Sequence, residues 1–66
     1  MDNREFAKQY LLAIEKENQE FFTQNQISIM SCVNIVGDGK LISVHIINEL
    51  IPDKIRYEIE SMFWIN

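Results

Sequence analysis

Two runs of alternating apolar and polar residues flank Gly37-Asp38-Gly39, and this arrangement constrains the fold more than any other feature of the chain. Alternation with a period of two is typical of a strand with one buried face. Asp-Gly between two such runs favours a tight turn, because both central positions of a type I′ turn need a positive φ. We therefore predict an antiparallel β-hairpin, with strands over residues 27–36 and 40–48.

The register of this hairpin can be judged from the apolar pattern. A two-residue loop, Asp38-Gly39, would pair Ile35 with Ile42 and would place the strongly apolar side chains on one face. A three-residue loop would mix apolar and polar side chains on each face, because a slip of one residue turns every side chain over. The pattern favours the two-residue loop, and a four-residue loop remains as the alternative that also keeps the faces consistent.

Helical periodicity precedes and follows the hairpin. Residues 3–23 are predicted to form a helix, and its apolar stripe consists of Phe6, Tyr10, Ile14 and Phe21, flanked by Ala7, Leu11 and Phe22. Glu17 and Asn18 interrupt this stripe, so the helix either bends there or presents a polar edge. A second helix is expected from Pro52-Asp53, with a hydrophobic staple between Leu50 and Ile55. Its inward residues are predicted to be Ile55, Ile59, Met62 and Phe63.

Together these elements predict an α+β fold, helix–β-hairpin–helix (αββα), in a single small domain over residues 1–66 with a two-stranded antiparallel sheet. The centre of the core is expected to consist of Ile14, Val33, Val44 and Ile59.

A chain of this size has little core, so small domains often need a disulfide, a metal or a partner subunit. The single cysteine, Cys32, excludes an internal disulfide, and with the single histidine, His45, it cannot complete a four-ligand zinc site. A lone hairpin is also marginal in water and leaves two strand edges open. We therefore expect a homodimer, formed either by edge pairing into a four-stranded sheet or through a partly apolar hairpin face.

Charge and hydropathy narrow the classes of partner. Ten acidic residues against six scattered basic ones give a net charge of −4, which makes nucleic acid an improbable ligand for this chain. No apolar run approaches the roughly 20 residues that span a bilayer, so no membrane partner is expected. The polar N-terminus and the lone thiol predict a cytoplasmic protein.

Cys32 and His45 are the residues to consider for catalysis, since the two-residue turn would place them directly opposite each other. A cysteine nucleophile needs a base, but a strand pair offers no oxyanion hole or cleft. We interpret the pair as an ordinary thiol beside an ordinary histidine. No catalytic, metal-binding or cofactor-binding residue is predicted.

The second face of the hairpin mixes apolar and polar residues in a way that is common at protein interfaces. Either it contacts a partner or one of the helices covers it. Trp64 lies off the stripe of the second helix and would either pack near Phe21 or Phe22 or serve as an exposed contact. The predicted partner-binding residues are Met30, Cys32, His45, Ile47, Tyr57 and Trp64.

These observations predict a small acidic, non-catalytic protein-binding module. By analogy with proteins of this size and charge, it would act as an inhibitor, antitoxin, immunity protein or phage-encoded modulator that occludes a partner protein. The alternatives are a dimeric nucleic-acid-associated protein and, less in keeping with the sequence, a small enzyme that uses Cys32 and His45.

Overall fold

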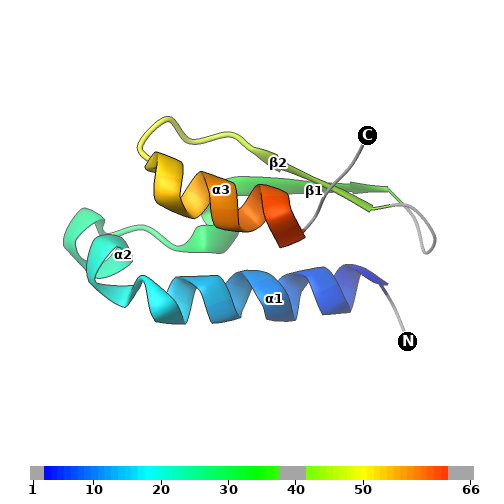
Figure 1. The fold of residues 1–66 in the computed structure, drawn as a ribbon, viewed down its shortest axis with the longest axis horizontal. Coiled ribbons are helices and arrows are strands. Elements are labelled where there is room, and N and C mark those ends of the chain that lie inside the picture. The colour runs from blue at the N-terminus through cyan, green and yellow to red at the C-terminus, as the bar shows by residue number, and fades with distance from the viewer. Residues whose placement is uncertain (1–2, 38–41, 63–66) are drawn as a thin grey trace.

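The predicted α+β class is confirmed: helices pack on one side of a two-stranded antiparallel hairpin (Figure 1). The computed structural model describes residues 3–37 and 42–62, with the side chain of Met62 excepted. Within these residues α3 contacts both α1 and β2, so it joins the long first helix to the sheet. The described elements, in chain order, are α1 (Asn3–Glu17), α2 (Gln19–Asn25), the short 3-10 helix η1 (Ile29–Ser31), β1 (Val33–Gly37), β2 (Ile42–Ile46) and α3 (Asp53–Met62).

The first helical segment is divided at Asn18, where the sequence predicted either a bend or a polar edge. The Asn18 side chain donates through Nδ2 to the carbonyl of Ile14 at 2.8 Å, a local bond of the kind that competes with regular helix geometry. The same nitrogen lies 3.4 Å from Glu58 Oε1, and Lys54 Nζ donates to Asn18 Oδ1 at 3.1 Å. Asn18 therefore both marks the end of α1 and links the first helical segment to α3 through side-chain hydrogen bonds.

This cross-helix contact gives a testable contribution to stability. Asn18→Ala should lower the free energy of unfolding by about 1 kcal/mol more than Asn25→Ala, because hydrogen bonds typically contribute about that much each. Asn25 is a matched control: its Nδ2 makes the same local bond, to the carbonyl of Phe21 at 2.8 Å, and no inter-helix bond is recorded for it. Urea unfolding of both variants measures the difference. Equal losses would mean that Asn18 acts only within its own helix.

The buried stripe of α1 is shifted by one position from the predicted one. Ala7, Leu11 and Ile14 are buried, whereas Phe6 and Tyr10 are 43% and 46% exposed. The buried positions follow the spacing i, i+4, i+7, and Phe6 and Tyr10 lie one residue before them, about 100° around the helix. The small side chain of Ala7 thus packs inward, and the larger aromatic side chains lie on the outer side of the helix.

The segment between α2 and the hairpin also departs from the prediction. Gln26 ends α2 with φ 56° in the left-handed region, and the N–H of Ile27 donates to the carbonyl of Phe22 at 3.1 Å. The predicted strand over residues 27–36 is replaced in its first part by η1, whose Ile29 N–H donates to Glu15 Oε2 at 3.2 Å. This carboxylate satisfies a backbone donor at the start of η1, and the strand begins at Val33.

The hairpin adopts the register that the sequence left as the alternative. Ile35 pairs with Val44 and Gly37 with Ile42, so four residues connect the strands and the favoured two-residue register is wrong. Both registers place the same side chains on the same face, which is why the apolar pattern could not separate them. The type I′ turn predicted at Asp38-Gly39 lies outside the described residues.

The core forms between the helices and the inner face of the hairpin. Three of the four residues predicted for its centre, Ile14, Val33 and Ile59, are buried, and Val44 is half-buried against them. The predicted staple at Leu50 is wrong, since Leu50 is 57% exposed and its neighbour Ile51 is buried instead. The largest fully buried side chains are Phe22, Leu11, Ile29, Ile55, Ile59 and Cys32.

Candidate functional site

Cys32 and His45, the pair considered for catalysis, are not brought together. Cys32 is fully buried in the core, and its carbonyl accepts a 2.9 Å hydrogen bond from the N–H of Ile47. His45 is exposed and lies opposite Asn34. The opposition predicted from the two-residue turn is therefore wrong, because the actual register moves each partner by two positions.

The mixed hairpin face is divided between the core and the surface. Cys32 and Met30 pack into or against the core, so the buried Cys32 is not available as an exposed contact. Asn34, Val36 and His45 remain exposed on the outer face. The described helices all lie on the opposite side of the sheet, so none of them covers this outer face (Figure 1). Ile47, just beyond β2, is 64% exposed.

The two edges of the hairpin differ in their chemistry. Arg4, near the start of α1, reaches the edge of β1: its Nη1 donates to the carbonyl of Gly37 at 2.9 Å and its Nη2 to that of Ile35 at 3.2 Å. Among the residues that the structure describes, no side chain makes a recorded hydrogen bond to the backbone of β2. The edge of β1 is thus covered by a side chain, whereas none of the described side chains binds the edge of β2, which we call the uncovered edge.

A stacked aromatic pair lies on the outer side of α1. The rings of Phe6 and Tyr10 are 6.5 Å apart with an angle of 23° between their planes. Together with Gln9 and Ala13 they line a shallow surface hollow of about 300 Å³. Residues i and i+4 on a helix are neighbours, which explains why this pair forms from local sequence alone.

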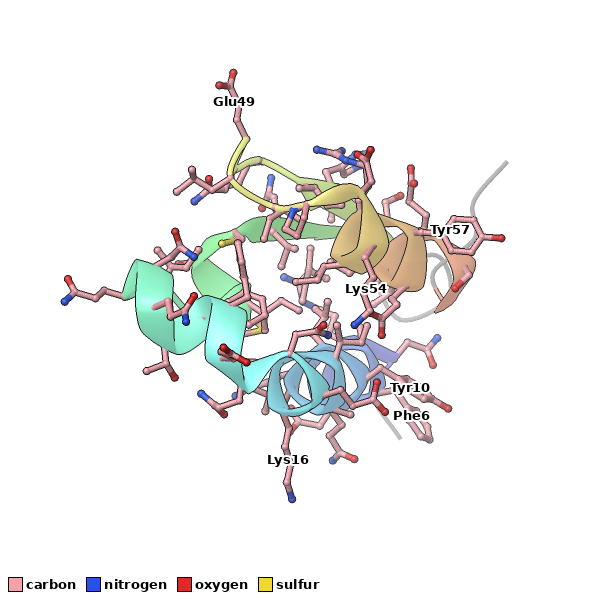
Figure 2. The ribbon with its side chains drawn as sticks, turned by 60° about the vertical axis from the view of Figure 1, so that its left-hand side comes forward. Phe6, Tyr10, Lys16, Glu49, Lys54 and Tyr57 are labelled. Carbon is pink, nitrogen blue, oxygen red and sulfur yellow. The ribbon has the colours of Figure 1, made fainter. Side chains whose placement is uncertain are left out.

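A second hollow of about 250 Å³ is lined by residues of α1 and α3, and Ala13 lines both hollows. Its other walls are Ile14, Glu17, Glu58 and Ser61. We call the two together the α1–α3 groove. Tyr57, 73% exposed, precedes Ser61 by one turn of α3 and therefore stands on the same side of that helix. Figure 2 shows Phe6, Tyr10 and Tyr57 projecting from the same side of the molecule.

The groove residues were only partly found from the sequence. Tyr57 was predicted as a contact and is exposed, whereas Phe6 and Tyr10 were expected in the core. The signal that would have placed them outside is the regular spacing of Ala7, Leu11 and Ile14, which defines a complete inward stripe without either aromatic residue. Trp64, the remaining predicted contact, lies outside the described residues.

Neither a cluster of metal-ligating side chains nor a membrane-spanning helix is found in the described part of the chain. No group of three or more His, Cys, Asp or Glu side chains there could hold a metal ion. No described helix is both long enough and apolar enough to cross a bilayer.

No protein-family model, curated protein or solved structure matches this chain. We therefore infer its function from the geometry of the groove and of the hairpin.

Proposed function

We propose that this chain is a small non-catalytic protein-binding module that occludes part of a partner protein and works as a homodimer in the cytoplasm. The observation that carries the proposal is the α1–α3 groove, two hollows that share Ala13, with Phe6 and Tyr10 lining one of them. The exposed ring of Tyr57 stands on the same side of α3 as Ser61, which lines the other. Aromatic residues, tyrosine in particular, are enriched among the residues that contribute most to protein–protein binding.

The shape of the groove favours a protein over a small molecule. Its two hollows, of about 300 and about 250 Å³, lie at or below the lower end of the sizes typical of small-molecule pockets. Tyr57 stands out from α3 with 73% of its surface exposed, so it can enter a hollow on another protein. A surface that both offers a hollow and projects a side chain is typical of an interface between proteins.

The charges beside the groove indicate the chemistry of the partner. Phe6, Tyr10 and Ala13 form an apolar end, and Glu17 and Glu58 border the other end. A partner would place an apolar side chain against the aromatic pair and a lysine or arginine near the two carboxylates. The net charge of −4 adds an attraction to a basic surface at longer range.

Several further features support the other parts of the proposal. The register places Cys32 opposite Ile47 and His45 opposite Asn34, which supports a non-catalytic role for the two residues. The single unpaired cysteine fits a reducing compartment such as the cytoplasm. The small core and the uncovered edge of β2 favour a second subunit.

The groove can be tested by comparing variants in affinity capture from cells of the source organism. We expect Tyr57→Ala and Phe6→Ser to lose a protein that the unchanged chain retains, with affinity at least about tenfold weaker, as for other interface hot spots. Leu50→Ala is the matched control, because Leu50 is a comparably exposed apolar residue that does not line the groove. Titration calorimetry with the purified partner would give the change in affinity.

Two results would contradict this assignment. A captured protein that survives both groove substitutions, or that is lost equally with Leu50→Ala, would place the interface elsewhere. Thermal unfolding of each variant must be compared first, so that a loss of binding is not a loss of folding.

A further inference from the structure

We infer that the uncovered edge of β2 pairs with β2 of a second copy, with Val44 on the two-fold axis, to form a continuous four-stranded antiparallel sheet. This inference rests on the homodimer proposed above and gives it an interface. It is independent of the α1–α3 groove, whose residues lie on α1 and α3.

The hydrogen-bonding pattern of the hairpin determines which backbone groups point outward. The N–H of Ile47 donates to the carbonyl of Cys32, so these two residues form a hydrogen-bonded pair across the strands. Hydrogen-bonded and non-hydrogen-bonded pairs alternate along an antiparallel ladder. His45 with Asn34 is therefore the next hydrogen-bonded pair, and the N–H and C=O groups of Ile42, Val44 and Ile46 point away from β1.

The same alternation places the carbonyls of Ile35 and Gly37 on the outer edge of β1, where Arg4 binds them. A strand that approached β1 would have to displace this guanidinium and both of its hydrogen bonds. Covering an edge with a charged side chain is a common way in which proteins prevent strand addition. The structure thus selects β2, and not β1, as the edge that accepts another strand.

The sequence of β2 lacks the features that usually protect an exposed edge. Its five residues, ISVHI, include no Lys, Arg, Asp, Glu or Pro. The absence of acidic residues matters for a second copy in particular, because two chains of net charge −4 can meet here without placing carboxylates opposite each other. A row of alternating backbone donors and acceptors is complementary to another extended strand. The β2 strand of a second copy is such a strand.

The side chains on the inner face of β2 also favour this partner. Val44 and Ile46 pack against the core yet stay only half-buried, and Ile42, which shares their face of the strand, is half-buried too. A two-fold axis perpendicular to the sheet would keep the helices of both copies on the same face. It would bring these three residues beside their equivalents and bury an aliphatic strip that one copy leaves partly exposed.

Full overlap of the two strands determines the register. With Val44 opposite Val44 of the second copy, Ile42 pairs with Ile46, and every outward backbone group of β2 finds a partner. Ser43 then lies opposite His45 of the second copy in a non-hydrogen-bonded pair, where Cα atoms are about 4.5 Å apart. That distance suits a disulfide.

The register predicts a selective cross-link. Chains carrying Ser43→Cys and chains carrying His45→Cys, one of them tagged to differ in mass, are mixed and mildly oxidised. We expect the mixed disulfide to exceed either homodimeric disulfide severalfold. The unchanged chain, whose Cys32 is buried, is the control and should remain uncross-linked under the same conditions. Sedimentation and thermal unfolding of the unchanged chain over a hundredfold dilution test the dimer itself, since a dimer loses stability on dilution.

The outcomes separate the inference from the proposal on which it rests. A monomer at every concentration, with one unfolding temperature, would overturn both the homodimer and its interface. A dimer without the mixed disulfide would leave the homodimer standing and overturn pairing through β2. Stronger homodimeric disulfides would overturn the register centred on Val44. Phe6→Ser should leave both the disulfide and the dilution behaviour unchanged, which separates this surface from the groove.

Discussion

Phe22→Ala is expected to lower the free energy of unfolding by about 3–5 kcal/mol, as for other buried phenylalanines. Phe22 is 1% exposed at the centre of the core, and its ring meets that of Phe21 edge-on at 5.2 Å. Its carbonyl also accepts the N–H of Ile27 at the end of α2. Because small domains have a total stability near the low end of about 5–15 kcal/mol, the variant should be largely unfolded at room temperature.

Phe21→Ala provides a control of identical chemistry at the neighbouring position. Phe21 is only half-buried, so its loss should cost roughly half as much, given that the cost follows the apolar area buried. Circular dichroism during urea unfolding would measure both. Equal losses, or a larger loss for Phe21, would show that the inward face of α2 has been assigned to the wrong residue.

Cys32 should react with a thiol reagent at least about a hundredfold more slowly in the folded protein than in the unfolded chain. The side chain has no exposed surface, so labelling requires the protein to open. An opening that costs about 3 kcal/mol slows the reaction by roughly that factor, since each 1.4 kcal/mol is a factor of ten. Labelling by a chromogenic disulfide with and without urea measures the ratio.

A cysteine introduced at the exposed position Gln24 would show the rate of an accessible thiol on the same fold. Labelling of Cys32 at that rate would contradict its burial. Labelling faster than a free thiol would mean an activated nucleophile and would revive the enzyme hypothesis.

The periodicity of the sequence was sufficient for the order of the elements, the inner face of the hairpin and the inward residues Ile55 and Ile59 of α3. It was sufficient because amphipathic elements bury one face, and the spacing of the apolar residues indicates which face that is. The periodicity could not determine the register of the hairpin, since the two candidate loops differ by two residues and expose the same side chains. The 3-10 helix η1 depends on Glu15, fourteen residues earlier, and no local pattern contains that contact.

The candidate site was harder to predict for a related reason. Phe6 and Tyr10 are large aromatic residues of the kind found in cores. They are exposed only because they lie on the side of α1 that faces away from the core. Likewise, Cys32 lies in the core and not on the hairpin face because η1 turns the chain just before β1. Tyr57 was predicted as a contact from its residue type, since tyrosine is enriched at binding hot spots, and the structure places it 73% exposed.

In the proposed dimer, the two hydrogen bonds of Arg4 would limit how large an assembly of this chain can become. A protein with two adhesive strand edges can add copies head to tail without end, because each addition leaves a fresh edge exposed. With β1 occupied by a guanidinium, each copy would offer only β2 for strand pairing, and the pairing of two such edges would leave neither of them open. Arg4, on the first turn of α1, would thus prevent further strand addition, so that the sheet keeps a fixed number of strands and does not extend into a fibre.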